Sequence, residues 1–153
     1  MAGGWNSAPM GADDVDSILR DLSGDEGAAT YPRGFAGMTV TSITTGSTTN
    51  CTVPLNAFLR IKRPLLNAAA CVDLSYVQDI KVGTISLNVG TQPMPCVAFA
   101  RDAVGTYIDA AVWASPSVAP VIVIYNNSGG TIIYAGGIFG DVSLQRPAGS
   151  VAS

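Results

Sequence analysis

The sequence predicts an all-β domain, an antiparallel β-sandwich or jelly-roll-like barrel, preceded by an N-terminal arm with one short α-helix. Three observations point to this class. From residue 38 onward, runs rich in β-branched and aromatic residues recur at roughly 8 to 12 residues, separated by Gly, Pro or Asn. Thr and Ser occupy nine of the fourteen positions 39–52, which favours strands. Convincing helical periodicity is confined to residues 13–22.

The first element is the arm, residues 1–37, which contains the predicted helix 13–22. Four apolar residues at spacing i, i+3, i+4 and i+7 share one helical face: Val15, Ile18, Leu19 and Leu22. Asp13 or Asp14 can cap the start and Gly24 follows the end. Because ten residues are marginal as an isolated helix, we expect this stripe to dock, either on the protein's own sheet or on a neighbouring subunit.

The second element is a β domain over residues 38–146, followed by a tail of small and polar residues, 147–153. Strands are expected at 38–45, 48–55, 58–66, 71–76, 80–89, 94–101, 107–113, 120–125, 131–135 and 138–144. The run 58–66 alternates only loosely between apolar and basic residues. No internal repeat at a fixed period is present, which argues against a solenoid or propeller.

The segment 121–137, VIVIYNNSGGTIIYAGG, predicts two strands joined as a hairpin through the turn residues Asn126 to Gly130. A half-exposed strand alternates apolar with polar residues, yet neither flank carries a charge. We therefore expect both faces of the first strand to be covered, with Ile122 and Val123 pointing to opposite sides.

The composition argues against an enzyme and against a bound cofactor or metal. The chain has no His, which removes the commonest general base and the commonest zinc ligand. No phosphate-binding or dinucleotide-binding glycine pattern occurs. An aspartate pair at a distance suited to glycoside hydrolysis stays open as a formal competitor, drawn from Asp73, Asp79, Asp102, Asp109 and Asp141.

Composition also bears on location. The longest apolar stretch, residues 118–125, is far shorter than the roughly 18 to 20 residues that span a bilayer, so we expect no membrane insertion. The start of the chain lacks a secretory signal, which predicts synthesis and folding in the cytoplasm. Three cysteines cannot all pair, and Cys51, Cys71 and Cys96 are expected to be buried thiols.

Charge is sparse and unevenly placed. Charged residues make up 12% of the chain, and the mean hydropathy is +0.34. Residues 1–27 hold six carboxylates and one arginine, a net −5, whereas residues 28–153 sum to +2. The one basic cluster is Arg60, Lys62 and Arg63. With a pI near 4.5, this cluster is expected to pair with the acidic arm of the same or a neighbouring chain rather than with nucleic acid.

The chain combines a Gly- and Ala-rich arm that has one short helix with a β domain that is low in charge and lacks catalytic residues. In this layout it resembles small virion structural proteins of bacteriophages. These are the capsid decoration (cement) and minor capsid proteins. The resemblance implies a protein that binds the outside of an assembled capsid, commonly as trimers, with the arm tying subunits together. The arm departs from coat proteins that package nucleic acid, because those often carry a basic arm.

The sequence thus predicts a non-enzymatic virion protein that forms homo-oligomers, with a trimer favoured. It is expected to stabilise or decorate a shell through contacts with the major capsid protein or other virion proteins. The partner-binding residues are expected to be the helical stripe and the basic cluster. The alternative is a receptor- or carbohydrate-binding module of a phage tail or fibre, with Trp5, Trp113, Tyr107 or Tyr134 as the stacking platform.

Overall fold

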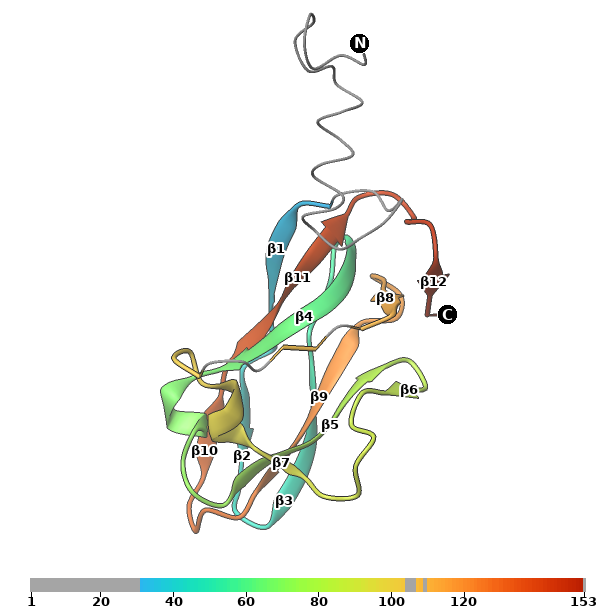
Figure 1. Cartoon of the computed structure of the whole chain (residues 1–153). Helices are drawn as coiled ribbons and strands as arrows, with labels where there is room; N and C mark the ends of the chain where they lie inside the picture. The colour runs from blue at the N-terminus through green and yellow to red at the C-terminus, as the bar shows by residue number, and fades with distance from the viewer. Residues whose placement is uncertain (1–30, 104–106, 109, 153) are drawn as a thin grey trace, which may run out of the picture. The chain divides into compact units, whose positions relative to one another are not determined.

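The computed structural model describes residues 31–103, 107–108 and 110–152, which fold into short strands and two single-turn 3₁₀ helices (Figure 1). The predicted helix 13–22 and its stripe Val15, Ile18, Leu19 and Leu22 lie outside the described residues. The strands are β1 (Arg33–Gly37), β2 (Thr41–Ile43), β3 (Ser47–Thr52), β4 (Phe58–Leu66), β5 (Ser75–Val82), β6 (Ile85–Ser86), β7 (Met94–Pro95), β8 (Val112–Ala114), β9 (Pro120–Asn126), β10 (Ile132–Tyr134), β11 (Gly136–Ser143) and β12 (Ser150–Val151). The 3₁₀ helices are η1 (Ala68–Ala70) and η2 (Cys96–Phe99).

The strands form two five-stranded sheets and one strand pair. The first sheet, here called the β4 sheet, has the order β1-β11-β4-β8-β12. The second, the β9 sheet, has the order β3-β9-β5-β6, with β7 also paired to β5. Strands β2 and β10 pair separately. All pairs between these strands are antiparallel except β12 with β8, and the predicted all-β, sandwich-like class is confirmed.

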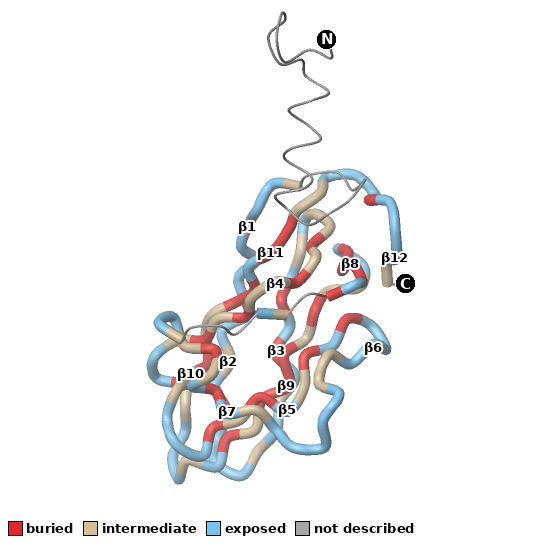
Figure 2. Tube along the Cα trace, viewed as in Figure 1, coloured by how far each residue is buried: buried red, intermediate tan, exposed pale blue. Residues whose placement is uncertain are grey.

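The core lies between the sheets, where the inward residues of each strand meet (Figure 2). Leu59 and Ile61 of β4 and Ile138 of β11 are at most 2% exposed. They belong to one apolar cluster with inward residues of the β9 sheet, namely Val77, Ile80, Val82, Ile122 and Ile124. Burial of these β-branched side chains is the main stabilising term of the sandwich.

The predicted hairpin at 121–137 is wrong in its pairing. The chain does turn after Asn126, but β9 pairs with β3 and β5 on its two sides, so neither edge is left for β10, which pairs with β2. Asn126 is fully buried and holds this corner: its Nδ2 donates to the carbonyls of Ile43 and Gly130, both at 2.8 Å. An uncharged apolar run is typical of such a central strand.

The two faces of β9 are buried unequally. Ile122 is completely buried in the core, while Val123 on the opposite face is 8% exposed between Asn50 of β3 and Asp79 of β5. Beyond it, Tyr125 stacks on Tyr76 with ring centroids 6.4 Å apart. The expectation that Ile122 and Val123 are both shielded is confirmed.

The loose alternation of apolar and basic residues in 58–66 is explained by the pairing register of β4 with β11. Ile61 and Pro64 both face the core although they are three residues apart, which a strand of period two cannot achieve without an extra residue. The pairing of β4 with β11 shifts by one residue between Phe139 and Gly140, opposite Arg63 and Ile61. This β-bulge keeps both Lys62 and Arg63 away from the core.

The sheets reach beyond the predicted domain limits of 38–146. Residues 33–37, assigned to the arm, form the edge strand β1, and residues 150–151 of the predicted tail form β12. The predicted strands 71–76 and 80–89 have wrong bounds, because β5 covers only the end of the first, the gap between them and the start of the second. Residues Cys96–Phe99, half of the predicted strand 94–101, form the 3₁₀ helix η2. Short strands with few apolar residues, such as β1, carry too weak a periodic signal to be recognised.

Candidate interaction surface

The face of the β4 sheet that points away from the core carries a cluster of charged residues. Arg33, Asp141 and Arg60 lie in one row across β1, β11 and β4. The Arg33 Nε atom lies 2.9 Å from Oδ1 of Asp141, and the Arg60 Nη2 atom lies 2.7 Å from Oδ2. Lys62 Nζ lies 3.9 Å from the same Oδ2. Asp141 is nearly buried, so this carboxylate orders three cations from two neighbouring strands.

Arginine and aromatic side chains alternate on the same face. The guanidinium of Arg60 lies over the ring of Trp113, 5.1 Å from its centroid, and that of Arg63 lies 5.7 Å from the centroid of Tyr107. Arg63 also donates through Nη2 to the carbonyls of Arg101 and Ala103. These contacts hold the planar guanidinium groups in place at the surface.

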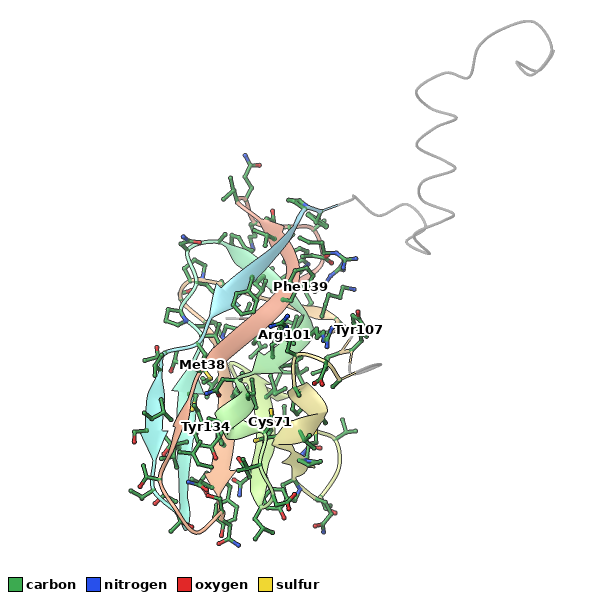
Figure 3. The ribbon with its side chains drawn as sticks, turned by 90° about the vertical axis from the view of Figure 1, so that its left-hand side faces the viewer. Met38, Cys71, Arg101, Tyr107, Tyr134 and Phe139 are labelled. Atoms are coloured by element: carbon green, nitrogen blue, oxygen red, sulfur yellow. The ribbon has the colours of Figure 1, made fainter. Side chains whose placement is uncertain are left out.

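A pair of phenylalanines extends this face to the edge of the sheet. Phe35 of β1 and Phe139 of β11 are directly opposite each other and are 54% and 36% exposed. The ring of Phe35 lies above Gly137, where a Cβ atom would collide with it. Figure 3 shows Phe139 with Arg101 and Tyr107 on this part of the molecule. Exposed aromatic rings beside arginines are typical of protein interfaces.

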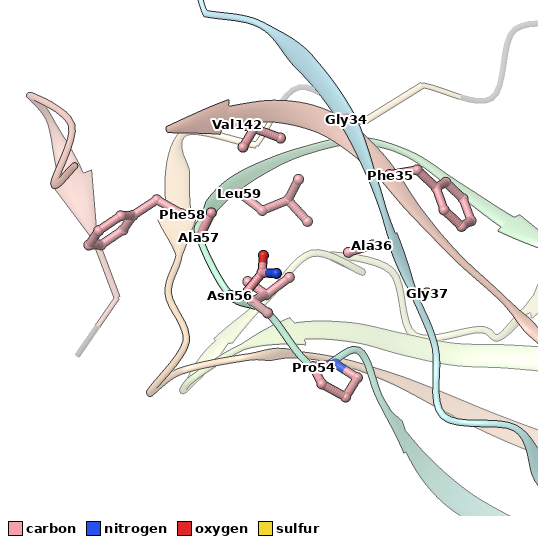
Figure 4. Close-up of a pocket in the computed structure, with 11 residues that line it drawn as sticks. Gly34, Phe35, Ala36, Gly37, Pro54, Asn56, Ala57, Phe58, Leu59 and Val142 are labelled. Carbon is pink, nitrogen blue, oxygen red and sulfur yellow. The ribbon is translucent and has the colours of Figure 1, made fainter. Parts of the chain in front are cut away.

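Strand β1 forms one border of the sheet and, among the described residues, pairs only with β11. A groove with a volume of about 560 Å³ runs along β1 on the core side, opposite the segment Pro54–Leu59. Figure 4 shows that the Phe35 ring points away from Asn56 of this segment. The groove lining carries no charge, so β1 presents an open edge with apolar surface on both of its faces.

The structure brings together the three basic residues predicted from sequence, Arg60, Lys62 and Arg63, on one face. Within the described residues, Asp141 lies within 4 Å of Arg60 and Lys62, although it is 81 residues along the chain from Arg60. The sequence analysis did not place Arg33, Phe35 or Phe139 on this surface, and it considered Tyr107 only as a platform for stacking on a sugar. Their only local signal is an apolar or basic residue in a weak strand pattern, and their grouping depends on strand order.

Other predicted sites are placed as follows. Trp113 and Tyr134 are buried and offer no open ring for stacking on a sugar, whereas Tyr107 is 66% exposed beneath Arg63. Asp79 accepts from Ile80 N, Asn88 N and Ser86 Oγ, and so organises a turn. Trp5 and Asp109 lie outside the described residues. Within the described ranges, no cluster of three metal-ligating side chains occurs.

The cysteines are free thiols, with Cys51 and Cys96 buried and Cys71 half-buried. Burial raises the pKa of Cys96 from 9.0 to about 11, against a smaller lowering by its hydrogen bond with Ser75. Burial likewise raises the pKa of Cys71, with Asp102 adding to the effect. Such thiols are poor nucleophiles at neutral pH.

No helix in the part of the chain that the structure describes is long and apolar enough to cross a membrane. Comparison with known proteins gives no match, because no family model, curated protein or solved structure shows significant similarity to the chain. Function is therefore inferred from the sequence and the structure of the chain itself.

Proposed function

We propose that this chain is a non-enzymatic structural protein of a bacteriophage particle, which self-associates and stabilises or decorates a capsid shell. The observation that supports it most is the outer face of the β4 sheet: exposed phenylalanines and ordered arginines that continue to an open strand edge. Monomeric proteins usually protect such edges with charges, bulges or covering segments. A surface of this kind serves binding to other proteins.

Charge supplies a second argument. The outer face carries Arg33, Arg60, Lys62 and Arg63 around Asp141, five side chains that sum to +3. Residues 1–27 sum to −5. Oppositely charged surfaces on the same chain favour association of copies and set their orientation. The acidic segment of a neighbouring copy is therefore the proposed partner of this face.

Two of the aspartates that could have formed a catalytic pair have structural contacts instead. Asp141 and Asp79, two of the five aspartates considered for acid catalysis, hold an ion-pair cluster and a turn. The buried tryptophan and tyrosine weaken the sugar-binding alternative. A particle protein made in the host cytoplasm and carried in the virion requires neither a catalytic group nor a glycan platform.

Sedimentation velocity of the full chain at micromolar concentrations tests self-association. We expect an oligomer that is weakened by Phe139→Ser on the outer face and retained by the matched control Ile85→Ser, an exposed position in the β9 sheet. Mass spectrometry of purified particles should then find the chain among their proteins. A monomer at about 100 μM that co-sediments with no particle contradicts the proposal.

A further inference from the structure

We propose that β1 pairs with β1 of a second copy of this chain, antiparallel and around a two-fold axis at Phe35, so that the two β4 sheets join into one continuous sheet. This inference rests on the proposed function only in that the chain self-associates. It adds the element, the register and the symmetry of the contact. This symmetry is two-fold, so the contact joins two copies and differs from the three-fold contact of the trimer that the sequence favoured.

The backbone of β1 sets the register. Met38 N donates to Gly136 O and Val142 N donates to Pro32 O, both at 2.8 Å. Because hydrogen-bonded positions alternate along an antiparallel pair, the even-numbered residues of β1 bond to β11. The N–H and C=O groups of Arg33, Phe35 and Gly37 therefore point to the open edge, where they are available to a further strand.

A two-fold axis at Phe35 satisfies all of these groups. Phe35 of one copy then exchanges two hydrogen bonds with Phe35 of the second, and Arg33 of each copy exchanges two with Gly37 of the other. The two Phe35 Cα atoms would be about 5.5 Å apart, as expected for a hydrogen-bonded antiparallel pair. The contact would cover a ring that is 54% exposed in the single chain.

The side chains of β1 suit this register. Arg33 of one copy lies opposite Gly37 of the other, so like charges do not face each other across the new edge. No atom lies within 4 Å of the position that a Cβ atom on Gly37 would take, which leaves room for the incoming arginine. A two-fold contact is also the commonest form of homo-oligomeric interface.

The acidic segment further favours the antiparallel arrangement. Residues 1–27, with a net charge of −5, precede β1 by only a few residues. A parallel pair would bring these two segments to the same end of the strands, where they repel. In the antiparallel register the two Arg33 positions are four residues apart along the strand, about 13 Å, and the segments leave at opposite ends.

Other sheet borders are less suited to such pairing. Strands β6 and β12 have two residues each, which offers few backbone groups. Strand β3 is longer, but its outward side chains Thr48, Asn50 and Thr52 are polar and exposed. Strand β1 combines an exposed aromatic ring with an edge that no other described strand pairs with.

A proline at position 37 tests the backbone contact in the full chain. Gly37→Pro removes an N–H group that points to the second copy and leaves the bonds between β1 and β11 in place. The matched control Gly37→Ala keeps the N–H group and has room for its methyl group. In sedimentation velocity, we expect Gly37→Pro to raise the dissociation constant about 10- to 100-fold and Gly37→Ala to leave it within about threefold.

Cross-linking tests the symmetry independently of the proline. With a short bis-maleimide, Phe35→Cys should give covalent dimers, whereas Ile85→Cys in the β9 sheet should not. The β1 contact would be overturned if the chain forms oligomers but Phe35→Cys gives no cross-link. It would also be overturned if Gly37→Pro and Gly37→Ala have the same dissociation constant. Either result would leave the proposal of self-association intact. A chain that stays monomeric at about 100 μM overturns both proposals.

Discussion

Asp141 shows how a single residue organises the outer face of the β4 sheet. Its side chain is only 7% exposed and meets Arg33, Arg60 and Lys62 within 4 Å. A nearly buried carboxylate is tolerated because hydrogen-bonded cations surround it. The same contacts orient the arginines that the proposed interface uses.

Replacing Asp141 should therefore destabilise the fold. We expect Asp141→Asn to lower the free energy of unfolding by about 2 to 4 kcal/mol, because partly buried Arg60 would lose its carboxylate. Denaturant titration followed by circular dichroism measures this change. The control Arg33→Gln, at a side chain that is 57% exposed, should cost less than about 1 kcal/mol. Equal effects of the two variants would contradict the central role of Asp141.

Cys96 makes stability depend on pH. Its folded pKa is raised by burial from 9.0 to about 11, so the folded state keeps the proton while the unfolded state releases it. This contribution is complete below pH 9 and is lost as pH rises toward about 11. We expect the free energy of unfolding to fall by up to about 2 to 3 kcal/mol over this range. Cys96→Ala should flatten the profile, and an unchanged profile in that variant would refute the assignment.

At the scale of elements, β9 and the corner after it decide the topology. A strand with both edges occupied and both faces covered needs apolar residues throughout, and β9 has them from Val121 to Tyr125. The Asn126 side chain donates to the Ile43 carbonyl of β2 and so holds the corner after which the chain continues to β10, the partner of β2. In β11, Gly140 allows close pairing, because a Cβ atom there would collide with the Arg60 carbonyl of β4.

Two substitutions in β9 test the two-sided burial. Ile122→Asp places a charge in the core and should lower the free energy of unfolding by about 4 kcal/mol or more. Val123→Asp points to the other face beside Asp79 and should cost about 1 to 2 kcal/mol through lost burial and repulsion. The control Val121→Asp lies opposite Lys81 and should cost less. Thermal and denaturant unfolding measure all three, and a silent Val123→Asp would contradict the coverage of that face.

At the scale of the whole molecule, uneven charge gives the chain two complementary regions. Association should weaken between about 0.05 M and 0.5 M salt, because salt screens the attraction between residues 1–27 and the outer face. Replacing Asp13, Asp14 and Asp16 together by Asn should weaken association at low salt and flatten this dependence. Sedimentation velocity measures both effects, with Asp73→Asn as the control outside the acidic segment. Association that is insensitive to salt would argue against the acidic partner.

Sequence reasoning identified the residues of the strands better than their partners. The run 58–66 was predicted with the bounds that β4 has, although its alternation between apolar and basic residues is only loose. The two-sided burial of β9 followed from its missing charges. The hairpin was wrong because turn chemistry specifies a reversal of the chain but says nothing about which edges β3 and β5 occupy.

The sequence by itself determined the all-β class, the shielded β9, the basic cluster in β4 and the acidic segment before the domain, since composition and short-range periodicity encode these features. Only the tertiary structure decided that Arg33 joins Arg60 at Asp141, that Phe35 meets Phe139, and that β1 forms an open edge. These contacts join residues about 80 to 110 positions apart in the chain. Strand order and register depend on the packing of the whole core, and no local pattern carries that information.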